Sequence, residues 1–149
     1  MQTKFRESII IYANVLKRFF NTDDPIVIAK KFHYTVRYPD TPIEALQAEV
    51  YKKRNGERII SINSSYDKTS KKVLCAHELG HAIFMDRFKL NYRDTRLDYE
   101  YAANLFAVAL LFEPDDFNIP LTQMTNFTLQ SILDYNIIDP TKTDVPQES

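Results

Sequence analysis

The chain contains the string HELGH at residues 77–81, inside an apolar run that a small fold has to bury. Residues four apart lie on one face of a helix, so the imidazoles of His77 and His81 can point at the same ion. Glu78 lies to one side of this pair, where its carboxylate can take a proton from water without binding the ion. The string therefore predicts a central helix that carries a metal site suited to hydrolysis.

Residues 73–76 and 82–84, on either side of the string, are apolar and favour a buried helix. The alternative interpretation is a core helix whose histidines bond to backbone carbonyls. Two neighbouring buried imidazoles need partners, however, and a metal ion supplies them. The single cysteine, Cys75, cannot form an internal disulfide, and its place in the apolar run indicates a buried thiol rather than a ligand or a nucleophile.

With 149 residues, 44% of them hydrophobic and 26% charged, the chain is expected to form a single domain over residues 1–149. A flexible tail is expected from about residue 140 to 149. No apolar run is long enough to span a membrane, and the N-terminus lacks the apolar stretch of a signal peptide. We therefore expect a soluble cytoplasmic protein.

The net charge of −1 argues against a dedicated nucleic-acid binder, but the charges are unevenly distributed. Residues 1–72 contain 14 Lys/Arg and 8 Asp/Glu, a balance of +6, whereas residues 73–149 contain 5 and 12, a balance of −7. This asymmetry predicts either attraction between the two parts of the chain or a polarised surface.

Hydrophobic periodicity and turn residues predict an α+β fold in which helices pack on a short, mostly antiparallel sheet. Asn55 followed by Gly56 indicates a β-hairpin between the last two expected strands. We expect strands at about residues 33–38, 50–53 and 57–63. We expect helices at about residues 4–20, 25–32, 68–86, 97–112 and 121–135, a short helical piece around 43–48 and a linker at 87–94.

A catalytic zinc ion commonly has three protein ligands and one open position, so a third ligand is needed. His33 lies at an expected helix-to-strand junction, where an ordinary surface or core histidine is the favoured interpretation. Asp94 and Asp98 come at the start of the next helix, where acidic residues also stabilise the helix dipole. Glu100 follows His81 by 19 residues, which leaves room for a loop and a return, and it is the preferred third ligand.

Residues 100–107 read EYAANLFA and are followed by an apolar pair and a proline. This string resembles the second signature of the ImmA/IrrE metallopeptidases, whose first signature is the HELGH helix. The resemblance covers roughly residues 25–117 and implies a small zincin-like fold and a bound zinc ion. It also implies that Glu100 is the third zinc ligand, because the first glutamate of the second signature has this role in the family.

Two features depart from the family pattern. Met85 stands where members often carry a further histidine, and Glu113 and Asp115 flank Pro114. Neither departure affects the inferred ligands.

The resemblance implies a zinc-dependent endopeptidase that cuts a regulatory protein, typically a helix-turn-helix repressor of a phage or mobile element. The alternative is a non-catalytic module, in which zinc stabilises the fold and the protein captures a repressor or another phage protein without cutting it. Glu78 argues against this alternative, since a structural zinc site does not need it. A direct DNA-binding regulator is disfavoured by the near-neutral net charge.

Three further roles are predicted, each with an alternative. Asn104, one turn after the third-ligand candidate, either orients that carboxylate or packs between helices. Tyr92, Tyr99 or Tyr101 either assists the oxyanion or packs as an amphipathic aromatic residue. The strand at residues 57–63 either aligns an extended substrate along an exposed edge or forms a plain structural hairpin.

Overall fold

The computed structural model describes residues 3–40, 47–86 and 96–141, and the structural statements that follow concern these parts of the chain. The strands are β1 (Thr35–Arg37), β2 (Ala48–Lys52) and β3 (Arg58–Ile62). The α-helices are α1 (Thr3–Phe20), α2 (Pro25–Lys31), α3 (Lys68–Asp86), α4 (Arg96–Leu111) and α5 (Asn126–Tyr135). Two 3₁₀ turns, η1 (Pro114–Asp116) and η2 (Leu121–Gln123), connect α4 to α5.

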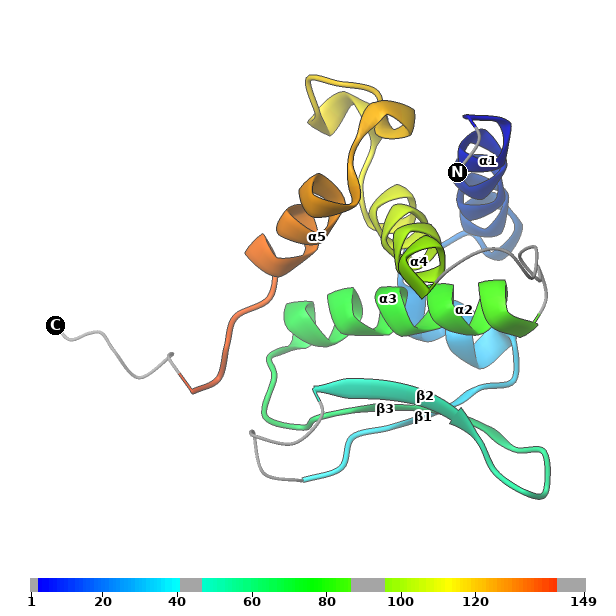
Figure 1. Cartoon of the computed structure of the whole chain (residues 1–149). Coiled ribbons are helices and arrows are strands. Elements are labelled where there is room, and N and C mark those ends of the chain that lie inside the picture. Colours follow the sequence, from blue (N-terminus) through cyan, green and yellow to red (C-terminus); the bar gives the residue numbers. More distant parts are fainter. Residues whose placement is uncertain (1–2, 41–46, 87–95, 142–149) are drawn as a thin grey trace, which may run out of the picture.

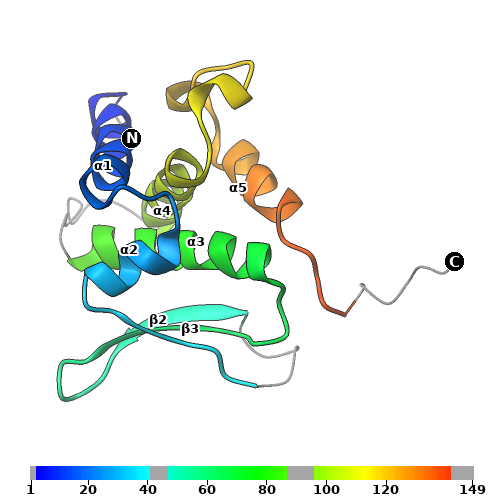
Figure 2. The same cartoon turned by 180° about the vertical axis from the view of Figure 1, so that it is seen from behind.

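The helices form two layers on one side of the sheet (Figure 1). Helix α3 crosses the sheet face, with α2 beside it, and α1, α4 and α5 lie beyond α3; the view from behind shows the same order (Figure 2). Helix α4 is the most apolar of the five, and Tyr101 to Leu110 are all buried in it. The hydrophobic core therefore surrounds α3 and α4, and α3 is the central helix that the sequence predicts.

The sheet has the strand order β1-β3-β2. Strand β2 pairs antiparallel with β3, as the hairpin prediction requires, whereas β1 pairs with β3 in parallel. The α+β prediction is confirmed, and the sheet is mixed rather than mostly antiparallel. Ile60 and Ile62 are buried, and Ile59 and Ser61, on the other face of the strand, are buried as well.

The position of β3 decides between the two alternatives for residues 57–63 and supports the plain structural hairpin. Strand β3 lies between two neighbours, so residues 57–63 have no exposed edge along which a substrate could align. The edge strand of the hairpin is β2, which pairs with β3 on one side only. The strand order depends on which strand β1 pairs with. Hydrophobic periodicity predicts the buried face of a strand but not its pairing partner.

The hairpin turn forms as the Asn-Gly pair predicts. Gly56 has a φ of +90°, a conformation that residues with a Cβ atom rarely adopt, and its N–H donates to the backbone oxygen of Lys53. The N–H of Lys53 in turn donates to the backbone oxygen of Glu57 at 2.8 Å. The register of β2 on β3 is therefore set at this turn.

Helix α3 begins at Lys68, as expected, and Asp67 caps it. Oδ1 of Asp67 accepts a hydrogen bond of 2.8 Å from the backbone N–H of Ser70. Hydrogen bonding with the Ser70 side chain, and next with this backbone N–H, lowers the pKa of Asp67. Oγ of Ser70 accepts a hydrogen bond from the backbone N–H of Ile138, which ties the chain after α5 to the start of α3.

Cys75 is fully buried in α3 and burial raises the pKa of its thiol, so the prediction of a buried thiol is confirmed.

Four expected segments differ from the structure or fall at least partly outside the described residues. The helix expected at residues 121–135 is interrupted, because Thr125 caps a new helix by accepting the backbone N–H of Thr128. Of the helical piece expected around 43–48, residues 43–46 lie outside the described residues, and Ala48 already belongs to β2. The linker expected at 87–94 and most of the tail expected from residue 140 also lie outside.

Within the described ranges, no helix is both long and apolar enough to span a bilayer.

Candidate metal centre

Helices α3 and α4 cross in close contact at Gly80, which lies between the two histidines of the motif. A Cβ atom at Gly80 would lie 2.9 Å from the backbone oxygen of Ala103 and 3.0 Å from its Cα atom, closer than side-chain carbons normally approach a backbone. Only glycine therefore permits this helix separation. The crossing holds the segment of α4 that carries Glu100 and Asn104 next to the histidines.

The side chains of His77, His81 and Glu100 converge at this crossing. The Nε2 atoms of the two imidazoles are 3.0 Å apart. The carboxylate oxygens of Glu100 lie 3.1 and 3.2 Å from Nε2 of His81, and Oε2 lies 3.6 Å from Nε2 of His77. The three side chains are 20%, 18% and 33% exposed, so the cluster is partly open to solvent rather than sealed in the core.

This donor set fits a zinc ion. Zinc binds imidazole nitrogen and carboxylate oxygen at about 2.0–2.2 Å in a tetrahedral arrangement, which places neighbouring ligand atoms about 3.3 Å apart. The observed donor separations run from 3.0 to 3.6 Å and bracket that value. Three protein ligands also leave a fourth position free, as in catalytic zinc sites. The cluster can hold a metal ion, and the identity of that metal stays a prediction.

The surroundings of His77 favour its uncharged form, which is the form that binds metals. Burial lowers the pKa of the His77 imidazole, and the neighbouring His81 lowers it further, while Glu100 raises it. A neutral imidazole keeps a free lone pair on one of its two nitrogens. The local electrostatics are therefore compatible with cation binding at neutral pH.

Glu78 lies one residue after His77, and its side chain is half-buried. Burial raises the pKa of Glu78 to about 7. The negative charges of Glu100 and Glu49 add to this rise, and a hydrogen bond from the backbone of Val50 opposes it. A cation bound by Glu100 would offset part of the rise, because positive charge favours the ionised carboxylate.

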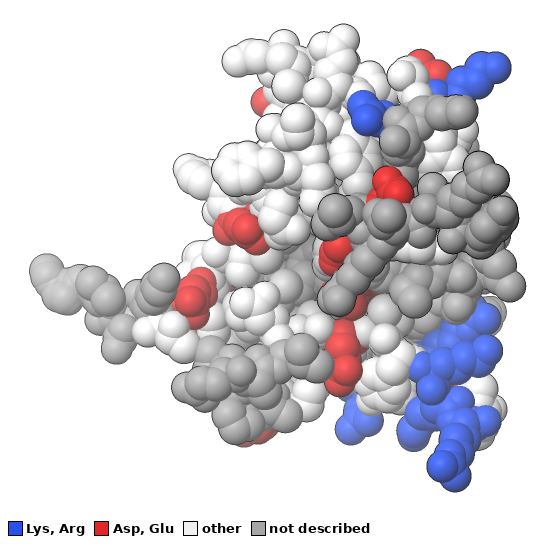
Figure 3. Space-filling model, in the orientation of Figure 1, with Lys and Arg blue, Asp and Glu red and all other residues white. Residues whose placement is uncertain are grey.

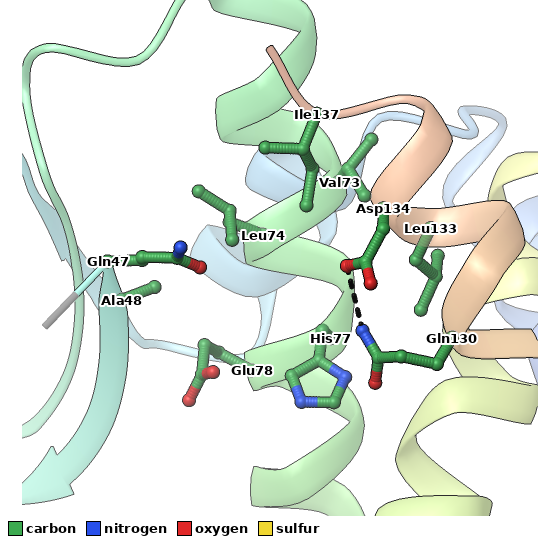
Figure 4. Close-up of a pocket in the computed structure, with 10 residues that line it drawn as sticks. All are labelled: Gln47, Ala48, Val73, Leu74, His77, Glu78, Gln130, Leu133, Asp134 and Ile137. Atoms are coloured by element: carbon green, nitrogen blue, oxygen red, sulfur yellow. Dashed lines mark hydrogen bonds between the residues drawn. The ribbon is translucent and has the colours of Figure 1, made fainter. Parts of the chain in front are cut away.

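A pocket of about 360 Å³ opens beside His77 and Glu78, between the start of β2 and helix α5 (Figure 4). Its walls combine apolar side chains of α3 and α5 with the polar side chains of Gln130 and Asp134, which share a hydrogen bond of 3.0 Å. Both His77 and Glu78 point into this space in Figure 4. The pocket thus offers room for a ligand side chain directly beside the two motif residues.

Charges are separated on the surface. On the face shown in Figure 3, Lys and Arg gather at the lower right, over the turn end of the β2–β3 hairpin, whereas Asp and Glu are spread across the middle. Glu78 and Asp134 line the pocket, and none of the described lining residues is a lysine or an arginine. Of the two alternatives for the charge asymmetry, this face supports the polarised surface.

The remaining ligand candidates do not join the cluster. His33 is exposed and has a φ of 69°, in the bend that follows α2. Asp98 lies in the first turn of α4, where its charge favours the helix dipole. Asp94 lies outside the described residues. Glu100 is therefore the candidate that the fold brings to the histidines.

The three tyrosines considered for the oxyanion differ in their surroundings. The hydroxyl of Tyr101 is committed to packing, because it donates a hydrogen bond of 2.7 Å to the backbone oxygen of Met124. The guanidinium of Arg6 also lies 5.0 Å from the centre of the Tyr101 ring. Tyr99 is half-buried on α4, and Tyr92 lies outside the described residues. For Tyr101 the structure supports packing rather than a role at the oxyanion.

Helix α5 contributes residues that the sequence analysis did not single out. Gln130 and Asp134 line the pocket, and Asn126 contacts the Asn104 side chain. All three are ordinary polar residues of an amphipathic helix, a pattern in which polar side chains normally face solvent. No local signal distinguishes them, since their role depends on how α5 packs against α3 and α4.

Comparison with known proteins relates the chain to one family. Residues 29–129 match the Peptidase_M78 family, which is described as the IrrE N-terminal-like domain. The chain is also similar to the "uncharacterized immunity region protein 2" of Bacillus phage phi105, with 31% identity over 118 residues. That alignment covers 76% of this chain and 72% of the phage protein. No solved structure matches the chain.

Proposed function

From the membership of this chain in the ImmA/IrrE family of metallopeptidases, we propose that it is a zinc-dependent endopeptidase that cuts a regulatory protein. The observation that carries the proposal is the convergence of His77, His81 and Glu100 beside a carboxyl that a metal site does not need. That carboxyl belongs to Glu78. A purely structural zinc site has four protein ligands and no adjacent base.

Each residue of the site has a defined part in peptide hydrolysis. His77, His81 and Glu100 would hold zinc, which supplies Lewis acidity that polarises the scissile carbonyl and acidifies water. Glu78 accepts a proton from the attacking water as the new carbon–oxygen bond forms. Glu78 then returns that proton to the amide nitrogen as the carbon–nitrogen bond breaks, so it is unchanged at the end of the cycle.

The free edge of β2 is the place where an extended substrate is expected to align. Residues of β2 that pair with β3 through hydrogen bonds alternate with residues whose backbone groups point outward. The bonds between residues 47 and 63 and between residues 53 and 57 make Ala48, Val50 and Lys52 the outward-facing set. The hydrogen bond from Val50 to Glu78 supports this assignment. A substrate strand on this edge would pass directly beside the base.

Replacing Lys52 by proline tests this alignment. The change removes one outward N–H from an edge strand, where proline is tolerated, so we expect the fold to persist and KM to rise about fivefold, the value of one backbone hydrogen bond. Lys52→Ala controls for the lost charge. Tyr51→Pro is the contrasting variant at the neighbouring position. It removes an N–H that faces Ile59 of β3, so we expect this proline, unlike the one at Lys52, to destabilise the fold. An unchanged KM in a folded Lys52→Pro variant would exclude pairing at this position.

The proposed substrate is a helix-turn-helix repressor of a phage or mobile element. The similarity to an immunity-region protein of a phage supports a regulatory protein as the target. We expect the encounter to take place in the cytoplasm, and we expect no direct contact with nucleic acid.

Incubation of the protein with the repressor encoded beside it, followed by intact-mass spectrometry, tests the proposed function. Two fragments whose masses sum to the repressor plus one water are expected. A chelator should abolish their formation, and added zinc should restore it. Inactivation of an intact repressor would instead support the alternative, a zinc-stabilised module that captures its partner.

A further inference from the structure

Asn104 lies on α4 one turn after Glu100 and is fully buried. It is one of only a few polar side chains buried among the described residues, and burial of an amide is costly unless its donors and acceptor are used. The partners of Asn104 therefore indicate what the residue does.

The amide nitrogen of Asn104 is used entirely by helix α5. Nδ2 donates to Oδ1 of Asn126 at 2.8 Å and to Oε1 of Gln130 at 3.1 Å. Gln130 is itself held by Asp134 and lines the pocket beside His77 (Figure 4). These bonds fix the plane of the Asn104 amide, and its oxygen is left for a partner outside α5.

The amide oxygen of Asn104 and Nδ1 of His77 are both buried, and neither has a hydrogen-bond partner in the described structure. The helix crossing brings the two groups together, because Asn104 follows Ala103, whose backbone packs on Gly80 of the His77 helix. Gln130, which accepts from the Asn104 amide, also lines the same pocket as His77. One of these atoms can only accept, and the other donates whenever it carries a proton. A single proton on Nδ1 satisfies both.

We propose that Asn104 is a positioning residue that holds the proton of His77 on Nδ1, so that the lone pair of Nε2 points at the metal centre. This inference rests on the proposed zinc site. A neutral imidazole has one protonated nitrogen, and only the other can bind a metal, so a donor bond from Nδ1 selects the binding-competent tautomer. Helix α5 thereby controls a ligand on α3 through a residue on α4.

Of the two roles predicted for Asn104, the structure supports packing between helices, because its amide nitrogen bonds to α5. Its spacing from Glu100 suggested that it orients that carboxylate, because residues four apart share a helix face. The bonds to Asn126 and Gln130 instead leave its oxygen for the imidazole of His77.

Zinc affinity, measured by competition with a chromogenic chelator, tests the proposal without any substrate. Asn104→Leu keeps the approximate volume but removes the acceptor, and we expect zinc to bind 10- to 100-fold more weakly, the usual effect of losing such a partner. Asn104→Asp retains an acceptor and should keep the affinity within a fewfold of the original, because Asn126 and Gln130 can turn their NH₂ groups toward it. Rescue by aspartate distinguishes positioning from simple packing.

Two further variants separate this effect from damage to α5. Asn126→Ala removes one of the bonds that orient Asn104 and should weaken zinc binding in the same direction but less than Asn104→Leu. Asn136→Ala is the matched control, because its side chain bonds to the backbone oxygen of Ile132 within α5 and takes no part in the network. We expect unchanged zinc affinity for that control, with folding followed by circular dichroism.

The tautomer itself can be read in the metal-free protein by long-range ¹H–¹⁵N correlation spectra of His77. We expect Nδ1–H in the original protein and a shift toward Nε2–H in Asn104→Leu. Equal zinc affinity and an unchanged tautomer in a folded Asn104→Leu variant would overturn the inference and leave the proposed peptidase intact. Failure of the original protein to bind zinc would remove the proposed function, and the spectra of His77 would still decide the role of Asn104.

Discussion

Glu78→Gln is expected to reduce the rate of substrate cleavage by about 10²- to 10⁴-fold while zinc content and folding are retained. Glutamine has nearly the same shape as glutamate but cannot accept the proton of the attacking water. The ligands His77, His81 and Glu100 are untouched by the change, so the metal site should survive. Initial rates from the repressor assay, zinc stoichiometry and a thermal melt measure the three expected results.

Glu49→Gln is the matched control for this experiment. Glu49 lies on β2, is exposed, and its charge acts on Glu78, so the variant removes an equal negative charge near the site without removing the base. We expect it to cleave at a rate close to the original. If Glu78→Gln inactivated the repressor at the same rate as the original protein, the activity would be capture of the repressor and not its cleavage.

Gly80→Ala is expected to destabilise the fold by about 1–3 kcal/mol, the usual cost of forcing an extra carbon into a packed interior. The sign of this change in the free energy of unfolding is informative, because replacing glycine by alanine in an exposed helix interior normally stabilises the protein by about 1 kcal/mol. The new Cβ atom would lie 2.9 Å from the backbone oxygen of Ala103, so α4 has to move away from α3. That movement carries Glu100 away from the histidines, and zinc binding should weaken with stability.

The contact at Gly80 also predicts that a second substitution, at Ala103, does not relieve the clash caused by Gly80→Ala. The atoms that a Cβ would meet are the backbone oxygen, Cα and carbonyl carbon of Ala103, so trimming that side chain gives no relief. Gly80→Ala combined with Ala103→Gly should therefore remain as weak in zinc binding as Gly80→Ala alone. Urea unfolding and the chelator competition measure both effects. A more stable Gly80→Ala variant with unchanged zinc affinity would mean that the helices do not cross this closely.

Features determined by neighbours in the chain are those that the sequence predicts well. Helix α3 starts at the residue after its capping aspartate, Asp67, and the β2–β3 turn forms at Gly56. Each depends on a local hydrogen bond or on a backbone conformation that only one residue type adopts readily. The spacing of His77 and His81 is equally local, because the helix alone brings residues four apart together.

Features determined by packing between distant segments could not be inferred in this way. Periodicity predicted that α4 exists, yet which of its acids reaches the histidines depends on the rotation of α4 about its own axis at the Gly80 contact. The sequence left open whether residues 57–63 form an exposed edge, whereas the docking of β1 makes β3 the central strand and leaves β2 at an edge. The interruption before Thr125 was missed because a local cap competes there with continued helical periodicity.

The sequence by itself determined the two-histidine helix, its adjacent base and the order of most elements, since these depend on interactions within a few residues. Only the tertiary structure decided that Glu100 faces the histidines, that the amide nitrogen of Asn104 bonds to α5, and that α5 closes one wall of the pocket. The physical reason is that side-chain direction follows from helix position and spacing, but what lies in that direction depends on how whole helices pack.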